Sequence, residues 1–207
     1  MDIVIWIIAL SLYALFWLWY CGVKGRLSKH EVEIFISSFE AKGLSESALL
    51  NIREFLEQDD GREFFMVNLL EIKSPKRESQ KLLMGYFKKF MSGMIPRGGH
   101  PLFLAKAAAK NIENLNCEHA DDWSSVGIIR YRSRRDFAQI VLKTFGSEHH
   151  SDKLLSLKKT LAFPSTTTLF FGSPKIIIAL VLGLAAAVTQ VWLCLLYTSP
   201  SPRDVEE

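Results

Sequence analysis

The segment Arg97-Gly98-Gly99-His100 carries the residue types in this chain that are best suited to ligand binding or proton transfer. Two adjacent glycines let the backbone approach a bound group closely. An arginine can hold an anion, and a histidine titrates near neutral pH and can therefore transfer a proton. The competing interpretation is a turn that ends a helix and leads into an edge strand. We take Arg97 and His100 as candidate pocket or ligand-binding residues.

Asn68 is the one amide in the otherwise apolar run FFMVNLLEI at residues 64–72. Side chains alternate along a strand, so Asn68 shares a face with Phe64, Met66 and Leu70. A buried amide needs hydrogen-bond partners. A neighbouring strand or loop can supply them, or the amide can line a pocket, and we therefore keep Asn68 as a candidate.

A third group of candidates lies in the run SVGIIRYR at residues 125–132. Arg130 and Arg132 share one face of the expected strand, and Tyr131 lies on the other. The arginines suit a solvated face, a contact with lipid phosphates, or a clamp for an anionic substrate. Arg130 and Tyr131 complete the set of candidate site residues.

The sequence lacks the common catalytic and metal-binding motifs. It has no CxxC pair, no HExxH, no glycine-rich nucleotide loop and no GxSxG elbow, and its five histidines have no ligand spacing. We expect no metal and no cofactor, and the catalytic residues are unknown, so the sequence does not decide whether the chain is an enzyme. The 25 basic and 22 acidic residues give a net charge of +3, which becomes +5 without residues 194–207; this balance suits an anionic membrane surface and is too diffuse for nucleic acid.

Two uncharged apolar runs predict membrane-spanning helices, at residues 3–23 and 176–193. Each is close to the roughly 20 residues that cross a bilayer as a helix. Lys24, Arg26 and Lys29 follow the first run and Lys175 precedes the second, so the positive-inside rule places the central domain in the cytoplasm. We expect a protein of the bacterial inner membrane with the bilayer as one of its partners.

The end of the chain, residues 194–207, has a different origin in our interpretation. Cys194 to Asp204 reads CLLYTSPSPRD, which an adapter used to build sequencing libraries would encode in frame. The alternative is an ordinary tail rich in serine and proline. We exclude these residues from the fold argument.

The central part predicts an α+β domain. A helical segment at 27–58 precedes a domain at 60–171, in which strands are expected at 64–72, 101–109, 125–132 and 166–171. Helices are expected between the first two strands and after the third, with a basic helix near 150–160. This order is the split βαβ arrangement, a four-stranded antiparallel sheet with helices on one face. A second copy is expected to cover the other face and form a homodimer, and the helices at 28–58 are the rival cover.

Four segments, FFMVNLLEIK, RGGHPLF, WSSVGIIRYRSRRDF and KTLAFP, resemble DUF1330-type proteins of the dimeric α+β-barrel superfamily. The resemblance implies a ferredoxin-like fold. The wider superfamily includes cofactor-independent monooxygenases, isomerases and haem-degrading enzymes. We expect a membrane-anchored α+β-barrel protein of unknown biochemical role that binds a small ligand or a protein partner. The alternative is a monooxygenase- or isomerase-like enzyme, which a closed apolar pocket with Asn68 and His100 would favour.

Overall fold

The computed structural model describes residues 2–113, 115, 122–170 and 172–198. The chain divides into two compact units. One comprises the two ends of the chain, and the other runs from Tyr20 to Thr167. The expected tail at 194–207 lies mostly outside the described residues, except that its first residues belong to the last helix.

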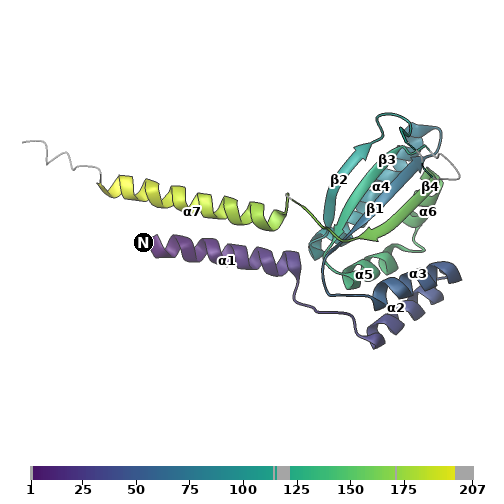
Figure 1. Ribbon diagram of the computed structural model, residues 1–207, viewed down its shortest axis with the longest axis horizontal. Coiled ribbons are helices and arrows are strands. Elements are labelled where there is room, and N and C mark those ends of the chain that lie inside the picture. Colours follow the sequence, from purple (N-terminus) through teal and green to yellow (C-terminus); the bar gives the residue numbers. More distant parts are fainter. Residues whose placement is uncertain (1, 114, 116–121, 171, 199–207) are drawn as a thin grey trace, which may run out of the picture. The chain divides into compact units, whose positions relative to one another are not determined.

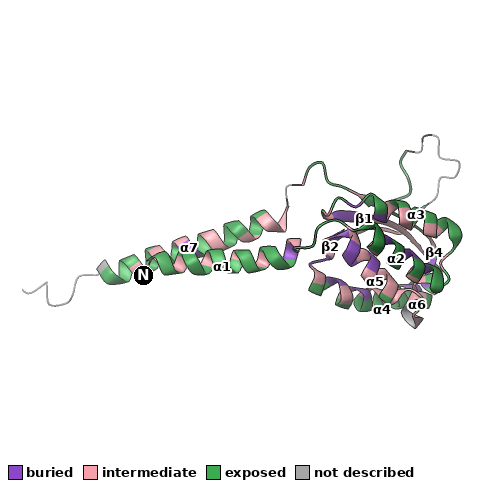
Figure 2. Cartoon of the chain, turned by 90° about the horizontal axis from the view of Figure 1, so that it is seen from below, coloured by how far each residue is buried: buried purple, intermediate pink, exposed green. Residues whose placement is uncertain are grey.

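The first unit contains two long apolar helices, α1 (Asp2–Cys21) and α7 (Pro174–Thr198). Both are long and apolar enough to cross a membrane, with mean hydropathies of 2.1 and 2.4 over their apolar stretches. Most of their side chains are exposed (Figure 2). The indole Nε1 of Trp6 donates a hydrogen bond of 2.8 Å to Oε1 of Gln190, so the polar amide in α7 is satisfied within this unit.

The second unit begins with two helices that precede the sheet. They are α2 (Lys29–Ala41) and α3 (Glu46–Glu57). The predicted capping box is present, because the Ser28 hydroxyl accepts from the Glu31 amide and the Glu31 carboxylate accepts from the Ser28 amide. Their apolar residues pack against α5 (Arg134–Thr144), mainly through Val32, Phe39 and Leu56 around Ala138. The alternative in which these helices cover the free face of the sheet is therefore wrong.

Four antiparallel strands form one sheet in the order β2-β3-β1-β4 (Figure 1). The strands are β1 (Phe64–Ile72), β2 (His100–Lys106), β3 (Ser125–Tyr131) and β4 (Leu157–Ser165). The connecting helices are α4 (Lys76–Met94), which continues into the short 3-10 helix η1 (Ile95–Arg97), then α5 and α6 (Glu148–Ser156). The domain is thus a mixed α+β structure with a four-stranded antiparallel sheet.

The fourth strand differs from the expected one. The sequence predicts a basic helix near 150–160 and a strand at 166–171, whereas β4 occupies Leu157–Ser165 and pairs with the length of β1. Lys158 and Lys159 suggest a solvated helix when they are considered alone. An edge strand also accepts lysines, because its outer edge faces water.

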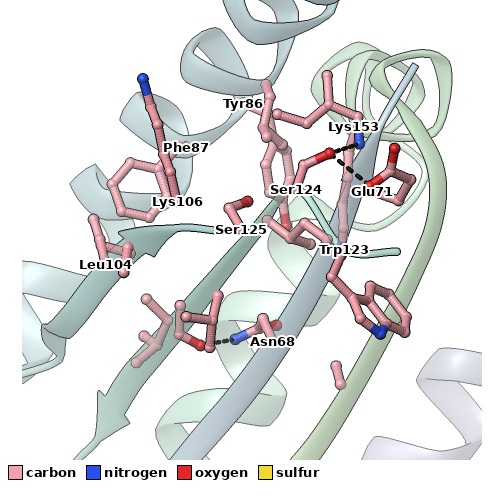
Figure 3. Close-up of a pocket in the computed structure, with 18 of the residues that line it drawn as sticks. Asn68, Glu71, Tyr86, Phe87, Leu104, Lys106, Trp123, Ser124, Ser125 and Lys153 are labelled. Carbon is pink, nitrogen blue, oxygen red and sulfur yellow. Dashed lines mark hydrogen bonds between the residues drawn. The ribbon is translucent and has the colours of Figure 1, made fainter. Parts of the chain in front are cut away.

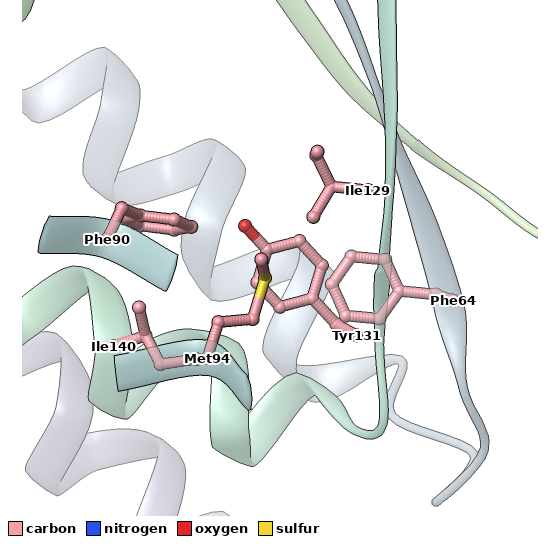
Figure 4. Close-up of a cluster of buried hydrophobic side chains, with 6 residues drawn as sticks. All are labelled: Phe64, Phe90, Met94, Ile129, Tyr131 and Ile140. Carbon is pink, nitrogen blue, oxygen red and sulfur yellow. The ribbon is translucent and has the colours of Figure 1, made fainter. Parts of the chain in front are cut away.

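The core lies between the sheet and the helices α4 and α5. Phe64 and Tyr131 are paired across β1 and β3, and their rings stack with centroids 5.1 Å apart. Around them pack Phe90 and Met94 from α4, with Ile129 and Ile140 (Figure 4). This cluster closes one end of the space between the two layers.

Candidate functional site

A cavity of about 1140 Å³ lies between the sheet and the helices α4, α5 and α6 (Figure 3). Its volume is above the range of about 300–1000 Å³ that is usual for small-molecule sites. Phe90, Ile129 and Tyr131 of the core cluster form its apolar end. Most of the remaining wall is also apolar, with contributions from Met66, Leu70, Leu83, Phe87, Leu104, Phe137 and Val141.

Small residues on the neighbouring strands create the cavity floor. Asn68 of β1 is paired with Gly127 of β3 on one side and with Ala162 of β4 on the other. All three line the cavity. Since neither neighbour carries a large side chain, the Asn68 amide is left accessible from the helix side.

The Asn68 amide is held in one orientation. Its Nδ2 donates to the backbone oxygens of Met66 at 3.0 Å and Gly127 at 3.3 Å. Among the described residues no donor lies against Oδ1. Asn68 therefore offers one free acceptor to the cavity, since both backbone carbonyls fix its donor group.

Three lysines from three different elements line the cavity. Lys76 opens α4, Lys106 ends β2, and Lys153 lies on α6. All three line the cavity, and no ion pair joins any of them to a carboxylate in the described part of the chain. We call these residues, together with Ser125, the polar end of the cavity.

The strand register places the polar end together. Lys106 is paired with Ser125, and Ser125 is paired with Leu70 near the end of β1. The amide of Lys73 donates to the Ser156 carbonyl at 3.0 Å, and its Nζ donates to the Leu154 carbonyl at 3.1 Å. The end of α6 is thereby attached to the end of β1, which brings Lys153 to this side of the cavity.

Burial changes the acidity of several cavity groups. It lowers the pKa of Lys153, whose Nζ lies 5.6 Å from the centroid of the Tyr86 ring. Burial raises the pKa of Tyr86 to about 12 and also raises that of Tyr131. Burial, together with the charge of Lys153, lowers the pKa of His150. These shifts follow from the low polarity of the surrounding wall.

The acidic groups near the polar end already have partners. Glu71 accepts a hydrogen bond of 2.6 Å from the Ser124 hydroxyl, which in turn accepts from the Ile72 amide at 3.1 Å. Asp122 lies 3.9 Å from Lys110. Glu71 keeps its negative charge, and the four lining lysines Lys76, Lys106, Lys110 and Lys153 outnumber the carboxylates of Glu71 and Asp122, so the wall carries a net positive charge.

Arg130 lies in a separate cluster on the opposite face of the sheet from Tyr131. Only 1% of its side chain is exposed. It donates to Glu63 through Nε at 2.8 Å and through Nη2 at 2.6 Å, to the Gly98 carbonyl at 2.5 Å and to the Tyr20 carbonyl at 3.0 Å. All of these bonds are made within the protein, so Arg130 has a structural environment rather than a solvated one.

His100 and Arg97 lie near Arg130 and do not line the cavity. His100 Nε2 lies 2.9 Å from the Tyr20 hydroxyl, and Nδ1 lies 3.1 Å from the Pro101 carbonyl. Because a carbonyl can only accept, Nδ1 carries the proton and Nε2 accepts from Tyr20. Arg97 donates to the Gly93 carbonyl and lies 3.8 Å from Asp136. Of the five predicted site residues, the cavity brings together Asn68 and Tyr131 alone.

The sequence did not point to the lysines or to His150. His150 and Lys153 are three residues apart on α6 and so share one helix face. That spacing was the available signal. An amphipathic helix usually buries its leucines and exposes its charged residues. Helix α6 does the reverse: Leu154 and Leu155 are exposed, and His150 and Lys153 face the cavity. The sequence therefore does not predict that these two residues line a site.

The other face of the sheet is apolar and open. Register places Phe103, Ile128, Val67 and Phe163 in one row across all four strands. Leu161 lies in the next row, opposite Leu69. Phe103, Leu161 and Phe163 are 52%, 48% and 44% exposed.

Comparisons with known proteins give no functional assignment. No protein-family model matches the sequence, and no curated protein matches it. The fold is similar to the crystal structure of RPA0582, a protein of unknown function from Rhodopseudomonas palustris. The TM-score is 0.49 and the identity 13%, over 61% of this chain and 96% of that chain. The structure of methylated RPA0582 gives a TM-score of 0.48 and 15% identity, over 63% of this chain and 96% of that one.

Proposed function

We propose that this chain is a membrane-anchored protein whose α+β domain binds a small molecule between its sheet and its helices. The cavity beside Asn68 carries the proposal. A domain with a purely structural role gains stability from a filled core, because empty space forfeits packing. Here Gly127 and Ala162 keep the floor open at the one strand amide in the wall.

The proposal assigns the domain to the ferredoxin-like, dimeric α+β-barrel type. The strand order β2-β3-β1-β4 and the helical connections after β1 and β3 support this assignment. The resemblance to DUF1330-type proteins belongs to the same proposal. In this arrangement the open apolar face of the sheet receives a second copy of the domain.

The proposal also includes membrane anchoring with the domain in the cytoplasm. The two apolar helices α1 and α7 support the anchoring. Lys24, Arg26 and Lys29 after the first helix and Lys175 at the start of the second support the orientation.

Calorimetric titration with a neutral ligand tests the binding role. The full chain in phosphatidylcholine nanodiscs is titrated with 1-octanol, and nanodiscs without protein give the partitioning heat. We expect one saturable site per chain. The double variant Gly127→Val/Ala162→Phe fills the floor on both sides of Asn68 and is expected to weaken binding at least about tenfold.

Gly85→Ala is the matched control for that variant. A methyl group at Gly85 meets open space, so octanol affinity is expected to stay unchanged. Thermal unfolding of all three proteins shows whether the domain remains folded. The binding role is wrong if the folded Gly127→Val/Ala162→Phe variant binds octanol as tightly as the natural chain does. It is also wrong if none of the three proteins binds octanol.

An enzymatic role is the second candidate, and His150 is the observation that favours it. Its ring lines the cavity, and burial and the charge of Lys153 lower its pKa, which keeps the ring neutral and able to accept a proton at neutral pH. A cofactor-independent monooxygenase would convert a hydroquinone and O2 into a hydroxyquinone and water, with the hydroquinone supplying all four electrons that reduce O2. The His150→Gln variant would then lose oxygen uptake and keep octanol affinity.

A further inference from the structure

We infer that the ligand of this cavity is an amphipathic anion, with its carboxylate or phosphate at Lys153 on the side of the cavity that Lys106 and Lys76 also line, and its apolar part toward Phe90 and Ile129. This inference rests on the proposed binding role and names the chemical class of the ligand. It follows from the distribution of charge and apolar surface along the cavity.

The charge requirement comes from the lysines. The Lys153 stem and ammonium are partly buried against Tyr86, and no described carboxylate pairs with the ammonium. An unpaired ammonium loses solvation when it is buried and gains strongly from an anion in the same surroundings. Lys106 and Lys76, which are exposed, add two more ammonium groups without a carboxylate partner among the described residues.

The lining lysines outnumber the lining carboxylates. The Glu71 carboxylate is bound by the Ser124 hydroxyl, and Asp122 faces Lys110. A cationic ligand would have to displace these contacts and would meet three lysines. An anionic headgroup instead forms charge-assisted hydrogen bonds, which are about twice as strong as neutral ones.

The apolar requirement comes from the opposite end. Ser125 at the polar end and Ile129 at the apolar end are four residue steps apart, which is roughly 13 Å along β3. Leu104, paired with Gly127, forms the wall between them, and Met66 lies beside Ile129. A ligand that is charged throughout would leave this wall without a partner, whereas an apolar chain or ring buries it.

Asn68 lies halfway along this path, because it is paired with Gly127. Its free Oδ1 suits a hydroxyl or N–H group in the middle of the ligand. Figure 3 shows the Asn68 amide below Ser125 and Leu104, with Lys106 and Lys153 on the elements around the cavity. The wall thus matches a molecule with an acidic head, an apolar tail and a polar group between them.

The test compares four ligands of one chain length against the full protein in phosphatidylcholine nanodiscs. They are octanoate, octyl phosphate, 1-octanol and octyltrimethylammonium, each titrated by calorimetry. We expect at least one of the two anions to bind about tenfold more tightly than octanol, and the ammonium compound to bind most weakly. The stronger anion identifies the head as a carboxylate or a phosphate.

The variant Lys153→Met is expected to lower the affinity for the preferred anion about tenfold and to leave octanol within twofold. Lys153→Arg retains the charge and should restore most of the loss. Lys81→Met is the matched control, since Lys81 is an exposed lysine of α4 outside the cavity. Because Lys153→Met removes a partly buried unpaired charge, its melting temperature should equal or exceed that of the natural chain.

The outcomes separate this inference from the binding role. The inference is overturned if octanol binds in a saturable manner and neither anion binds more tightly than octanol. It is also overturned if Lys153→Met leaves the preference for an anion unchanged. In both cases the cavity remains a binding site. If no ligand binds in a saturable manner, the binding role itself fails. A lower melting temperature for Lys153→Met would mean that Lys153 supports the fold rather than a ligand.

Discussion

The guanidinium carbon of Arg130 lies 3.5 Å from the centroid of the Tyr20 ring, and the Tyr20 carbonyl accepts a hydrogen bond from the same guanidinium. Tyr20 is 3% exposed. The chain therefore enters the domain at a residue that is fixed to the sheet by a buried cation. Arg130 joins this entry point to Glu63 and to the Gly98 carbonyl.

Substitution of Arg130 should destabilise the domain. In Arg130→Met, the Gly98 and Tyr20 carbonyls lose their donor and Glu63 loses its counter-charge, for a loss on the order of 3 kcal/mol. For a domain of this size that is a fall in melting temperature of about 6–12 °C. Scanning fluorimetry of the full chain measures it. Arg130→Lys keeps the positive charge but loses the planar guanidinium, so its melting temperature should lie between those of the natural chain and Arg130→Met. An unchanged melting temperature in Arg130→Met would show that the cluster does not stabilise the domain.

Glu31 should contribute to stability in a defined acid range. Hydrogen bonds from Arg135 and from the Ser28 amide lower the pKa of Glu31 from 4.5 to about 2. The folded state therefore holds this carboxylate charged where the unfolded chain protonates it. Its contribution is complete above pH 4.5 and disappears as the pH falls toward 2. The carboxylate is 39% exposed, so water limits the contribution to about 1 kcal/mol.

The variant Glu31→Gln isolates this effect. Its melting temperature should lie below that of the natural chain at pH 6, and the two should converge near pH 2. Glu40→Gln is the control, because Glu40 is an exposed residue of the same helix. If the melting temperatures of the natural chain and Glu31→Gln differ by the same amount from pH 6 to pH 2, Glu31 is not the titrating group.

Local patterns predicted the elements that depend on neighbours in the sequence. The capping box at Ser28 and Glu31 is present, and the run FFMVNLLEI forms β1. The edge strand β4 escaped prediction, because Lys158 and Lys159 carry no local sign of their pairing with β1. That pairing is a long-range property of the chain.

The site was predicted less completely than the fold, for the same reason. The face of Asn68 follows from alternation within one strand. The cavity beside it depends on Gly127 and Ala162, which reach Asn68 through the register of two other strands. Arg130 suggested a solvated charge, because two of its partners, the Tyr20 and Gly98 carbonyls, lie 110 and 32 residues away.

Reporter fusions test the orientation in the membrane. By the positive-inside rule, Lys24, Arg26 and Lys29 predict that the domain lies in the cytoplasm. An alkaline phosphatase fused after residue 60 should be inactive, because this enzyme matures outside the cytoplasm. The matched fusion after residue 198, at the end of α7, should be active. The reverse pattern would place the domain on the outer side of the membrane.

The open face of the sheet should join two copies of the domain. Phe103, Leu161 and Phe163 are each about half exposed, and full burial of such a side chain gains about 1.5–3 kcal/mol. A second copy presents the same apolar rows, so the interface can be self-complementary about a two-fold axis. Because α2 and α3 pack on α5, they leave this face available. We expect residues 20–167, which retain Tyr20, to form a dimer at micromolar concentration.

Light scattering with two matched variants tests this expectation. Phe163→Lys places a charge within the apolar row and should give a folded monomer, whose melting temperature falls only by the stabilisation that dimer formation gives the natural domain. Leu50→Lys makes the same kind of change at an exposed leucine of α3, away from the sheet, and should remain dimeric. A natural domain that stays monomeric at high micromolar concentration would rule out the sheet face as the contact between copies. A dimer that persists in Phe163→Lys and dissociates in Leu50→Lys would move that contact to the helical side.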